Sequence, residues 1–370
     1  MDRIVHDAIV IGGGISALTV AMQLRIRGYS VAVIDKQDGE GASGLPGGLA
    51  NPAYGREAKK SWRAEACIDS LNRLSELLSY VSAEHGIINN GVLRPASDQD
   101  QADVFRESPG RHKWKDGMAV WLEPAEAAGG FPLVKAENGA LWIEPAITIR
   151  LPSLLLALRT ALREKGALLL SASNIVVHDG TDMHTIIADG NEITSTKIIF
   201  APGPGIFDYP QWSLLKFNRV KGQVMEAEFS KSDEPGCSVA SSGYAAFTGS
   251  NRVVVGSTYE HSFKDSLPSE ATGGVLEKRF RIMCPAIAGS LTHIQHWAGV
   301  RLTTPDRKPC VGSHWNISGF YCIAGMGSRG LLMAPKVAEL LADHIYANTK
   351  IPDEIDADRF YHTRRFLNRV

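Results

Sequence analysis

Three small residues and one acid near the start of the chain have the types and spacing of a dinucleotide-binding motif. Gly12, Gly14 and Ala17 form a G-x-G-x-x-A sequence, and Asp35 follows it. Gly12 permits a tight turn, Gly14 lets the backbone approach a pyrophosphate, and Ala17 keeps a helix close to a sheet. The carboxylate of Asp35 can accept hydrogen bonds from a ribose diol, which argues against a 2′-phosphate. The pattern predicts a dinucleotide site without separating NAD from FAD.

The elements around this motif have the order that such a site requires. Residues 4–11 have the β-branched composition of a short buried strand, residues 18–26 have apolar side chains at helical spacing, and Gly28 closes that helix. Residues 29–35 are typical of a second strand ending in the acid. The first N–H groups of the intervening helix have no partner within the helix, so they favour an anion.

A second glycine-rich helix start lies near the end of the chain. Residues 325–345 read "GMGSRGLLMAPKVAELLADHI", in which the glycines lead directly into an amphipathic helix that we expect to begin near Ser328. No strand–helix–strand unit and no ribose acid follow it. By its sequence alone this segment is a poor candidate for a second phosphate loop.

The remaining segments predict a mixed fold with an inserted sheet. Residues 36–58 form a long loop rich in small residues, and residues 59–83 have the apolar stripe of an amphipathic helix. Residues 217–260 alternate like antiparallel strands. We therefore expect an α/β (α+β) fold, in which a Rossmann-like nucleotide domain is interrupted by a substrate domain built on an antiparallel sheet. The expected boundaries are 1–85, 150–212 and 298–370 for the nucleotide domain, and 86–149 and 213–297 for the substrate domain.

Composition and charge exclude several classes of protein. The 370 residues are 44% hydrophobic and 21% charged, as in an ordinary globular protein, and the net charge of −1 provides no global attraction to nucleic acid. No apolar run approaches the ~18 residues of a membrane span, so a cytoplasmic location is the expectation. Five scattered cysteines contain no C-x-x-C pair, and eleven histidines show no ligand spacing, so we expect neither a disulfide framework nor a metal site.

Taken together, several separated motifs resemble the D-amino-acid-oxidase superfamily of FAD-dependent oxidoreductases, and most closely its glycine oxidase and sarcosine oxidase branch. The matching stretches are "IVIGGGISALTVAMQL", "GASGLPGGLANP", "FAPGPG", "NRVKGQ", "RVVVGSTYE", "WAGVRLTTPDRKPCVG" and "GMGSRGLLMAPKVAELLA". A narrower likeness, in "GASG…GG…NP", "GSRGL" and the C-terminal tail, is to the oxidase half of the bifunctional enzyme that makes methylaminomethyl-uridine in tRNA. That enzyme also carries a methyltransferase half, for which we expect no room in these 370 residues.

The resemblance implies that FAD binds along several separated segments. Ala42, Ser43 and Gly44 would contact its phosphate and ribityl region, whereas composition alone is also compatible with a flexible surface loop. Val176 would lie on a strand that runs past the adenine. The second helix start would direct its positive end at the flavin pyrimidine edge. The implied FAD contacts are Gly12, Gly14, Ile15, Ser16, Ala17, Asp35, Lys36, Ala42, Ser43, Gly44, Gly47, Gly48, Leu49, Ala50, Val176, Ala201, Pro202, Gly203, Arg301, Gly325, Gly327, Ser328, Arg329, Gly330 and Leu331.

The resemblance also gives Arg301 and Tyr244 roles at the substrate. Arg301 stands where relatives keep an arginine that binds the substrate carboxylate, and a guanidinium matches a carboxylate with two parallel hydrogen bonds. Without the motif, a structural salt bridge would be the simpler interpretation of Arg301. Tyr244 would help to close the site, and a half-buried sheet aromatic is its alternative. Tyr259 and His261 are further candidates.

The implied reaction is oxidation of an amine C–N bond beside a carboxylate, by hydride transfer to flavin N5 and hydrolysis of the imine. Oxygen or another acceptor would reoxidise the flavin. Some relatives attach FAD through a cysteine, but the corresponding residue here is Gly299, so we predict non-covalent FAD.

Three alternatives to this reaction stay open. One is a tRNA-modifying oxidase that removes the carboxymethyl group of carboxymethylaminomethyl-uridine. Its candidate tRNA-binding cations are Lys59, Lys60, Arg63, Arg359, Arg364, Arg365 and Arg369. The others are a nicotinamide-dependent dehydrogenase and a non-catalytic nucleotide-binding protein.

Overall fold

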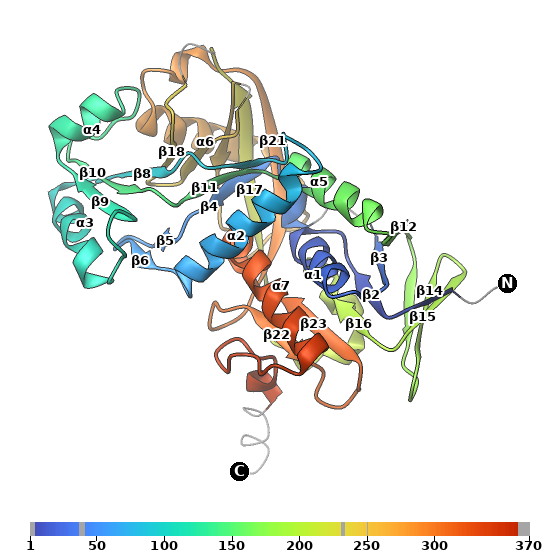
Figure 1. Ribbon diagram of the computed structural model, residues 1–370. Helices are drawn as coiled ribbons and strands as arrows, with labels where there is room; N and C mark the ends of the chain where they lie inside the picture. Colours follow the sequence, from blue (N-terminus) through green and yellow to red (C-terminus); the bar gives the residue numbers. More distant parts are fainter. Residues whose placement is uncertain (1–3, 37–40, 231–233, 250, 362–370) are drawn as a thin grey trace.

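The computed structural model describes residues 4–36, 41–230, 234–249 and 251–361. Helices and strands are mixed along the chain, and two large sheets dominate the arrangement (Figure 1). Among the described residues, no helix is both long and apolar enough to cross a membrane.

A six-stranded sheet carries both glycine-rich helix starts. Its strands lie in the order β12 (Leu168–Ser171), β3 (Val31–Asp35), β2 (Ala8–Ile11), β16 (Ile198–Phe200), β23 (Phe320–Ala324) and β22 (Cys310–Ser313). All neighbours are parallel except β22 and β23. Because parallel strands end at the same edge of a sheet, the residues at the ends of β2, β3, β16 and β23 meet there, where ligands of such folds bind. These residues are Gly12, Asp35, Ala201 and Gly325.

Opposite faces of this sheet are covered by different layers. Val10 and Val33 on one face pack against the helices α1 (Ile15–Ile26), α2 (Ala64–Ser79), α5 (Leu151–Glu164) and α7 (Gly330–Ala347). Ile9 and Ile34 on the other face pack against a four-stranded sheet and against the short 3-10 helices of residues 203–212. The order of that sheet is β1 (Ile4–His6), β15 (Asn191–Ser195), β14 (His184–Ala188) and β13 (Ile175–His178). The alternation of side chains along each buried strand therefore supplies two cores.

An eight-stranded, almost entirely antiparallel sheet forms the other half of the molecule (Figure 1). Its order is β21 (Thr292–Thr303), β17 (Asn218–Glu228), β20 (Arg252–Gly256), β19 (Tyr244–Phe247), β18 (Ser238–Ala240), β8 (Val92–Pro95), β10 (Ala140–Ile143) and β9 (Ala119–Leu122). Only β18 and β8 pair in parallel. Helix α6 (Glu270–Met283) contributes Leu276 and Phe280 to the core beneath this sheet.

Short elements connect the two large sheets. A three-stranded sheet joins β4 (Gly47–Ala50), β11 (Ile147–Arg150) and β7 (Ile87–Ile88), and β5 (Ala53–Tyr54) pairs with β6 (Lys59–Lys60). Helices α3 (Gln99–Arg111) and α4 (Pro124–Gly130) lie beside β9. The predicted mixed fold with an antiparallel sheet is confirmed, whereas the predicted domain boundaries stay a prediction.

Several predicted elements have different bounds in the structure. The loop over residues 36–58 is partly ordered by the 3-10 helix Ala42–Gly44 and by β4 and β5. Helix α2 begins at Ala64 rather than at residue 59, because Lys59 and Lys60 pair with β5 and Arg63 takes a left-handed conformation. The strand predicted over residues 4–11 is split at Asp7, whose carboxylate accepts hydrogen bonds from the Ser30 N–H and hydroxyl at 2.7 Å each. Tertiary pairing and side-chain hydrogen bonds override the local pattern at these places.

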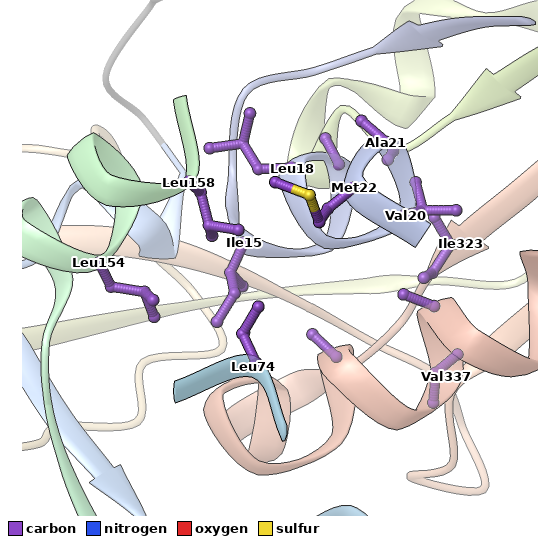
Figure 2. Packing of buried hydrophobic residues seen from close by; sticks show 14 of the residues in the cluster. Ile15, Leu18, Val20, Ala21, Met22, Leu74, Leu154, Leu158, Ile323 and Val337 are labelled. Carbon is purple, nitrogen blue, oxygen red and sulfur yellow. The ribbon is translucent and has the colours of Figure 1, made fainter. Parts of the chain in front are cut away.

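The largest core lies where four helices meet the six-stranded sheet. Figure 2 shows Ile15, Leu18 and Met22 of α1 beside Leu74 of α2 and Leu158 of α5. These side chains come from segments far apart in the sequence. Their packing holds the beginning of α1 in place at the edge of the sheet.

Replacing Leu158 by alanine should destabilise the protein much more than replacing Leu156. Both residues lie on α5, but Leu158 is 0% exposed and Leu156 is 63% exposed. Loss of the buried side chain should lower the free energy of unfolding by about 2–5 kcal/mol because a cavity remains. The exposed substitution should stay within ~0.5 kcal/mol. Urea unfolding followed by circular dichroism measures both, and equal losses would contradict this packing.

Candidate functional site

Two adjoining cavities lie at the carboxyl edge of the six-stranded sheet. The Gly12 cavity, of about 420 Å³, is lined by the residues that follow β2, β3, β16 and β23. The Tyr244 cavity, of about 430 Å³, lies between β4, β19 and the start of α7. Both are lined by Ile15, Ala42, Ser43, Arg301, Gly327 and Gly330. One elongated ligand can therefore extend from one cavity into the other.

The Gly12 cavity has the properties of a dinucleotide site. The N-cap residue of helix α1 is Gly14, which has no capping side chain, and no acidic residue lies in the first turn, so the N–H groups that follow Ile15 are available to a pyrophosphate. Gly12 has a φ of 117°, and a Cβ there would lie 2.4 Å from the carbonyl oxygen of Ala201. A Cβ at Gly14 would lie 3.0 Å from the Ser43 hydroxyl, which accepts a hydrogen bond from the Ile15 N–H at 3.1 Å. These residues fit the pyrophosphate of FAD.

Asp35 lies at the predicted position, at the end of β3 and in the wall of the Gly12 cavity. Two neighbours were missed by sequence reasoning. A Cβ at Gly13 would lie 2.0 Å from a carboxylate oxygen of Asp35, so a third glycine is needed here. Arg159 of α5 donates to the Gly13 carbonyl at 3.0 Å and lies 3.6 Å from the Asp35 carboxylate. The run of three glycines in the sequence was a signal for Gly13, but no local pattern marks Arg159.

Most of the predicted FAD contacts line one of the two cavities, and three do not. Ala17 and Ala50 are buried in the core. Val176 is 39% exposed, while its neighbour Ile175 lines the Gly12 cavity. The predicted residues that line a cavity are Gly12, Gly14, Ile15, Ser16, Asp35, Lys36, Ala42, Ser43, Gly44, Gly47, Gly48, Leu49, Ala201, Pro202, Gly203, Arg301, Gly325, Gly327, Ser328, Arg329, Gly330 and Leu331.

The start of α7 lies at the junction of the two cavities. A 3-10 helix over Gly327–Arg329 precedes α7, which begins at Gly330 rather than near Ser328 and has no side-chain cap. The Arg329 side chain lines the Tyr244 cavity, donates to the Arg307 carbonyl and lies 5.0 Å from the centre of the Tyr54 ring. Burial lowers the pKa of Arg329 below its usual value. The positive end of α7 thus adds to a cationic wall.

Arg301 is buried in the wall shared by the two cavities. Its side chain, on β21, is 8% exposed and donates to the Ser257 hydroxyl at 2.6 Å and to the Thr258 carbonyl at 3.4 Å. Within the described part of the chain, no carboxylate lies within 4.0 Å of the guanidinium, so the structural salt bridge that was its alternative is not found there. A buried guanidinium without a carboxylate is suited to an anionic ligand.

Glycine on the neighbouring strand makes room for this arginine. A Cβ at Gly222 of β17 would lie 2.4 Å from the Arg301 Nη2 atom. The Tyr259 ring lies 4.9 Å from the guanidinium carbon. Gly222 belongs to the "NRVKGQ" stretch, but nothing in that sequence shows which side chain it accommodates.

Tyr244 of β19 lines the cavity that is named after it. Burial raises the pKa of its hydroxyl to about 12, so the phenol is neutral near pH 7 and can donate a hydrogen bond. A Cβ at Gly48 would lie 3.5 Å from that hydroxyl and 3.1 Å from Leu331. The small residues of β4 therefore leave space between Tyr244 and α7. His261 instead lines a separate surface pocket with Phe217 and Arg219.

The Tyr244 cavity is strongly cationic. Arginines 94, 279, 301 and 329 line it, and no aspartate or glutamate does so among the described residues. Arg94 and Arg279 were missed by sequence reasoning. Arg94 lies in the apolar strand β8, where a charged residue is unusual, and this was the available signal.

Cysteines and metal ligands play no visible part in either cavity. The five cysteines are all buried and free, and none of them lines either cavity as described. Residues 4–36, 41–230, 234–249 and 251–361 contain no group of three histidine, cysteine or acidic side chains that could hold a metal.

Substituting Gly12 by alanine should weaken FAD binding about tenfold or more, since the new Cβ would displace the backbone turn beneath the pyrophosphate. Gly28→Ala is the matched control. Gly28 also has a positive φ, of 87°, but nothing lies within 4 Å of its added Cβ. Titration of the FAD-free proteins with FAD, followed by fluorescence, gives both dissociation constants. Unchanged FAD affinity in Gly12→Ala would show that the dinucleotide does not bind at this turn.

Comparison with known proteins places the chain among flavin enzymes. The model of the family DAO, "FAD dependent oxidoreductase", matches residues 7–344. Glycine oxidase of Pseudomonas aeruginosa is 25% identical over 93% of this chain and 96% of its own length. The crystal structure of glycine oxidase from Geobacillus kaustophilus superposes with a TM-score of 0.83 at 22% identity, covering 97% of this chain and 98% of that one.

A second group of relatives has longer chains. The tRNA 5-methylaminomethyl-2-thiouridine biosynthesis bifunctional protein of Paracidovorax citrulli is 28% identical over 97% of this chain, which spans 60% of that protein. The predicted family, and with it the prediction of FAD rather than a nicotinamide cofactor, is confirmed by the match over nearly the whole chain. The chain belongs to the DAO family and is an FAD-dependent oxidoreductase.

Proposed function

We propose that this protein oxidises the C–N bond of a small amine that carries a carboxylate, as in glycine or an N-substituted glycine. The observation that supports it most is Arg301, a buried guanidinium without a described carboxylate partner, at the junction of the two cavities. An arginine in this state favours a carboxylate ligand. Glycine oxidase relatives of nearly the same length have names that agree with this substrate class.

Binding and orientation are the tasks of the protein in this reaction. Arg301 would hold the carboxylate, and the neutral hydroxyl of Tyr244 would donate a hydrogen bond to the substrate in the same cavity. Leu49 and Leu331 would exclude water from the carbon that loses hydride. Fixing the carboxylate would limit the rotation of the short substrate and so lower the entropic part of the barrier.

FAD would be held by the Gly12 turn, Asp35 and the starts of α1 and α7. When bound, it supplies the acceptor for the hydride. The imine product would then hydrolyse in water. We also propose that the FAD is not covalently attached, since a Cβ at Gly299 would lie 3.1 Å from the Ala42 Cα and 3.2 Å from the Gly41 carbonyl oxygen.

The contacts of the candidate tRNA-binding cations favour a small substrate over tRNA. Lys59, Lys60 and Arg63 form ion pairs with Glu57, Glu65 and Glu354, and Arg359 pairs with Asp306. Arg364, Arg365 and Arg369 lie outside the described residues. Cations that already have carboxylate partners gain less from a phosphate backbone.

Anaerobic reduction of the bound flavin tests the proposed function. Glycine, sarcosine, proline, D-amino acids and undermodified tRNA are each mixed with the holoenzyme without oxygen, and bleaching of the flavin absorbance is followed. We expect bleaching by a small amine with a carboxylate. Bleaching by undermodified tRNA alone would support the tRNA-modifying oxidase instead, and a flavin that none of the amines reduces would refute the proposal.

Arg301→Ala should raise the KM for the carboxylated amine about tenfold to a hundredfold, because a charge-assisted hydrogen-bond pair is lost. The flavin should stay bound. Arg252→Ala is the control, since Arg252 lies in the same sheet but pairs with Glu228 at 3.2 Å and lines neither cavity as described. Steady-state kinetics measure both variants. A KM unchanged by Arg301→Ala would rule out the carboxylate contact.

Precipitation of the holoenzyme with acid should release yellow FAD into the supernatant, because non-covalent contacts are lost on unfolding. Absorbance of the two fractions near the flavin maximum measures the distribution. Colour retained in a washed pellet would mean that the cofactor is covalently attached.

A further inference from the structure

A second buried arginine in the Tyr244 cavity has no carboxylate partner. Arg94 is 7% exposed, donates from Nη2 to the Gly55 carbonyl at 2.7 Å, and lies over the Phe105 ring at 5.1 Å. Its buried Nε and Nη1 atoms have no hydrogen-bond partner in the described structure. Burial lowers the pKa of the guanidinium to about 10, so it still carries its charge near pH 7.

An unpaired guanidinium in this position is costly to bury. One backbone carbonyl satisfies one N–H, but it does not neutralise the charge. No carboxylate of the described residues lies within 4.0 Å of Arg94, in contrast to nearby Arg56, which pairs with Asp98 at 3.2 Å. A bound anion would supply both the missing charge and the missing acceptors.

The position of Arg94 shows where such an anion would lie. Arg94 lines the Tyr244 cavity and also a smaller neighbouring cavity of about 270 Å³, and Gly55, Ala240 and Ser241 line both of them. Arg94 therefore stands where the Tyr244 cavity opens toward a second compartment. The Ser241 side chain and the backbone of residues 240–243 are further polar groups in the same wall.

The positive charge of the Tyr244 cavity exceeds what one carboxylate can balance. Arg279 donates to the Ser257 carbonyl at 3.0 Å and Arg329 to the Arg307 carbonyl, so both also lack a described acidic partner. Glycine or sarcosine has a single carboxylate, and Arg301 would bind it. Two anionic groups on one substrate match the distribution of charge better.

We propose that Arg94 binds a second anionic group, a carboxylate or a phosphate-type group, on the nitrogen substituent of a substrate whose glycine unit is held by Arg301. The inference rests on the proposed function, because it assigns the other end of the same substrate. The preferred substrates are N-substituted glycines with an acidic end, rather than glycine or sarcosine. The competing interpretation is that Arg94 serves only to fix the backbone at Gly55.

Matched substrates test the second contact. N-(2-carboxyethyl)glycine, N-(2-phosphonoethyl)glycine and the neutral N-(2-carbamoylethyl)glycine differ only at the distal group, and homologues with longer chains cover other distances to Arg94. Flavin reduction by each is measured with the holoenzyme. The best acidic substrate should exceed the kcat/KM of its neutral amide about tenfold to a hundredfold. A preference for carboxylate or for phosphonate identifies the anion.

Variants separate binding of the anion from folding. Arg94→Met removes the charge and should abolish the preference for the acidic substrate over its amide. Arg94→Lys should keep part of the preference. Arg106→Met is the control, because Arg106 also stacks on an aromatic ring, Trp121 at 5.0 Å, but is ion-paired with Glu123 and lines no cavity described above.

A binding measurement distinguishes failure of this inference from failure of the proposed function. In 3-(carboxymethylthio)propanoate a sulfur replaces the amine, so the compound has both carboxylates but no C–N bond to oxidise. Calorimetry should show that the holoenzyme binds it about tenfold or more tightly than its distal amide, and that Arg94→Met loses this difference. Flavin reduction by sarcosine together with equal binding of acid and amide would overturn only the inference. A preserved binding difference without flavin reduction by any amine would overturn only the proposed function.

Discussion

The uncapped N-termini of two helices, held at one edge of a parallel sheet, are the constraint on which the rest of the site depends. Helices α1 and α7 follow β2 and β23, and β16 pairs with both of these strands. Because the three strands are parallel, both helix starts must lie at the same edge. The start of α1 lines one end of a continuous space, and the segment from Gly327 to Gly330 that begins α7 lines its middle. A long cofactor with negative charge at two places fits this arrangement.

The antiparallel sheet has a different task, which is to place polar and cationic side chains around the anionic group of a substrate. Its strand β21 carries Arg301, its strand β19 carries Tyr244, and its strand β8 carries Arg94. Rigid strands fix these side chains better than loops would, and glycines at positions 48 and 222 leave the space that they occupy. Burial raises the pKa of Tyr244 further above neutrality, so its hydroxyl stays a donor, and Arg94 and Arg301 have no acidic partner among the described residues. Burying these cations costs free energy. The same burial makes the cavity specific for an anionic ligand.

Sequence patterns predicted the features of the fold that are encoded locally. The glycine turn, α1 and Asp35 could be predicted because strand, turn and helix are consecutive in the chain, and α7 because its glycines and apolar residues are contiguous. Bounds failed where distant pairing decided them, as at Lys59 and Lys60, which pair with β5 instead of extending α2. Arg159 and Gly222 carry no local signal, since each acts on a residue from another part of the sequence. Arg301 could be identified only from the family motif around it.

The order in which the strands of the six-stranded sheet occur in the chain has a consequence for biosynthesis. β2 spans Ala8–Ile11, yet the strands that complete its edge, β16 and β23, begin at residues 198 and 320. Pairing across such long separations delays folding, because the chain must first close large loops. During synthesis the first glycine turn therefore emerges from the ribosome long before the second half of its ligand-binding wall exists. We therefore expect FAD to be captured only after β23 has been made, so that the cofactor stabilises a late stage of folding rather than an early one.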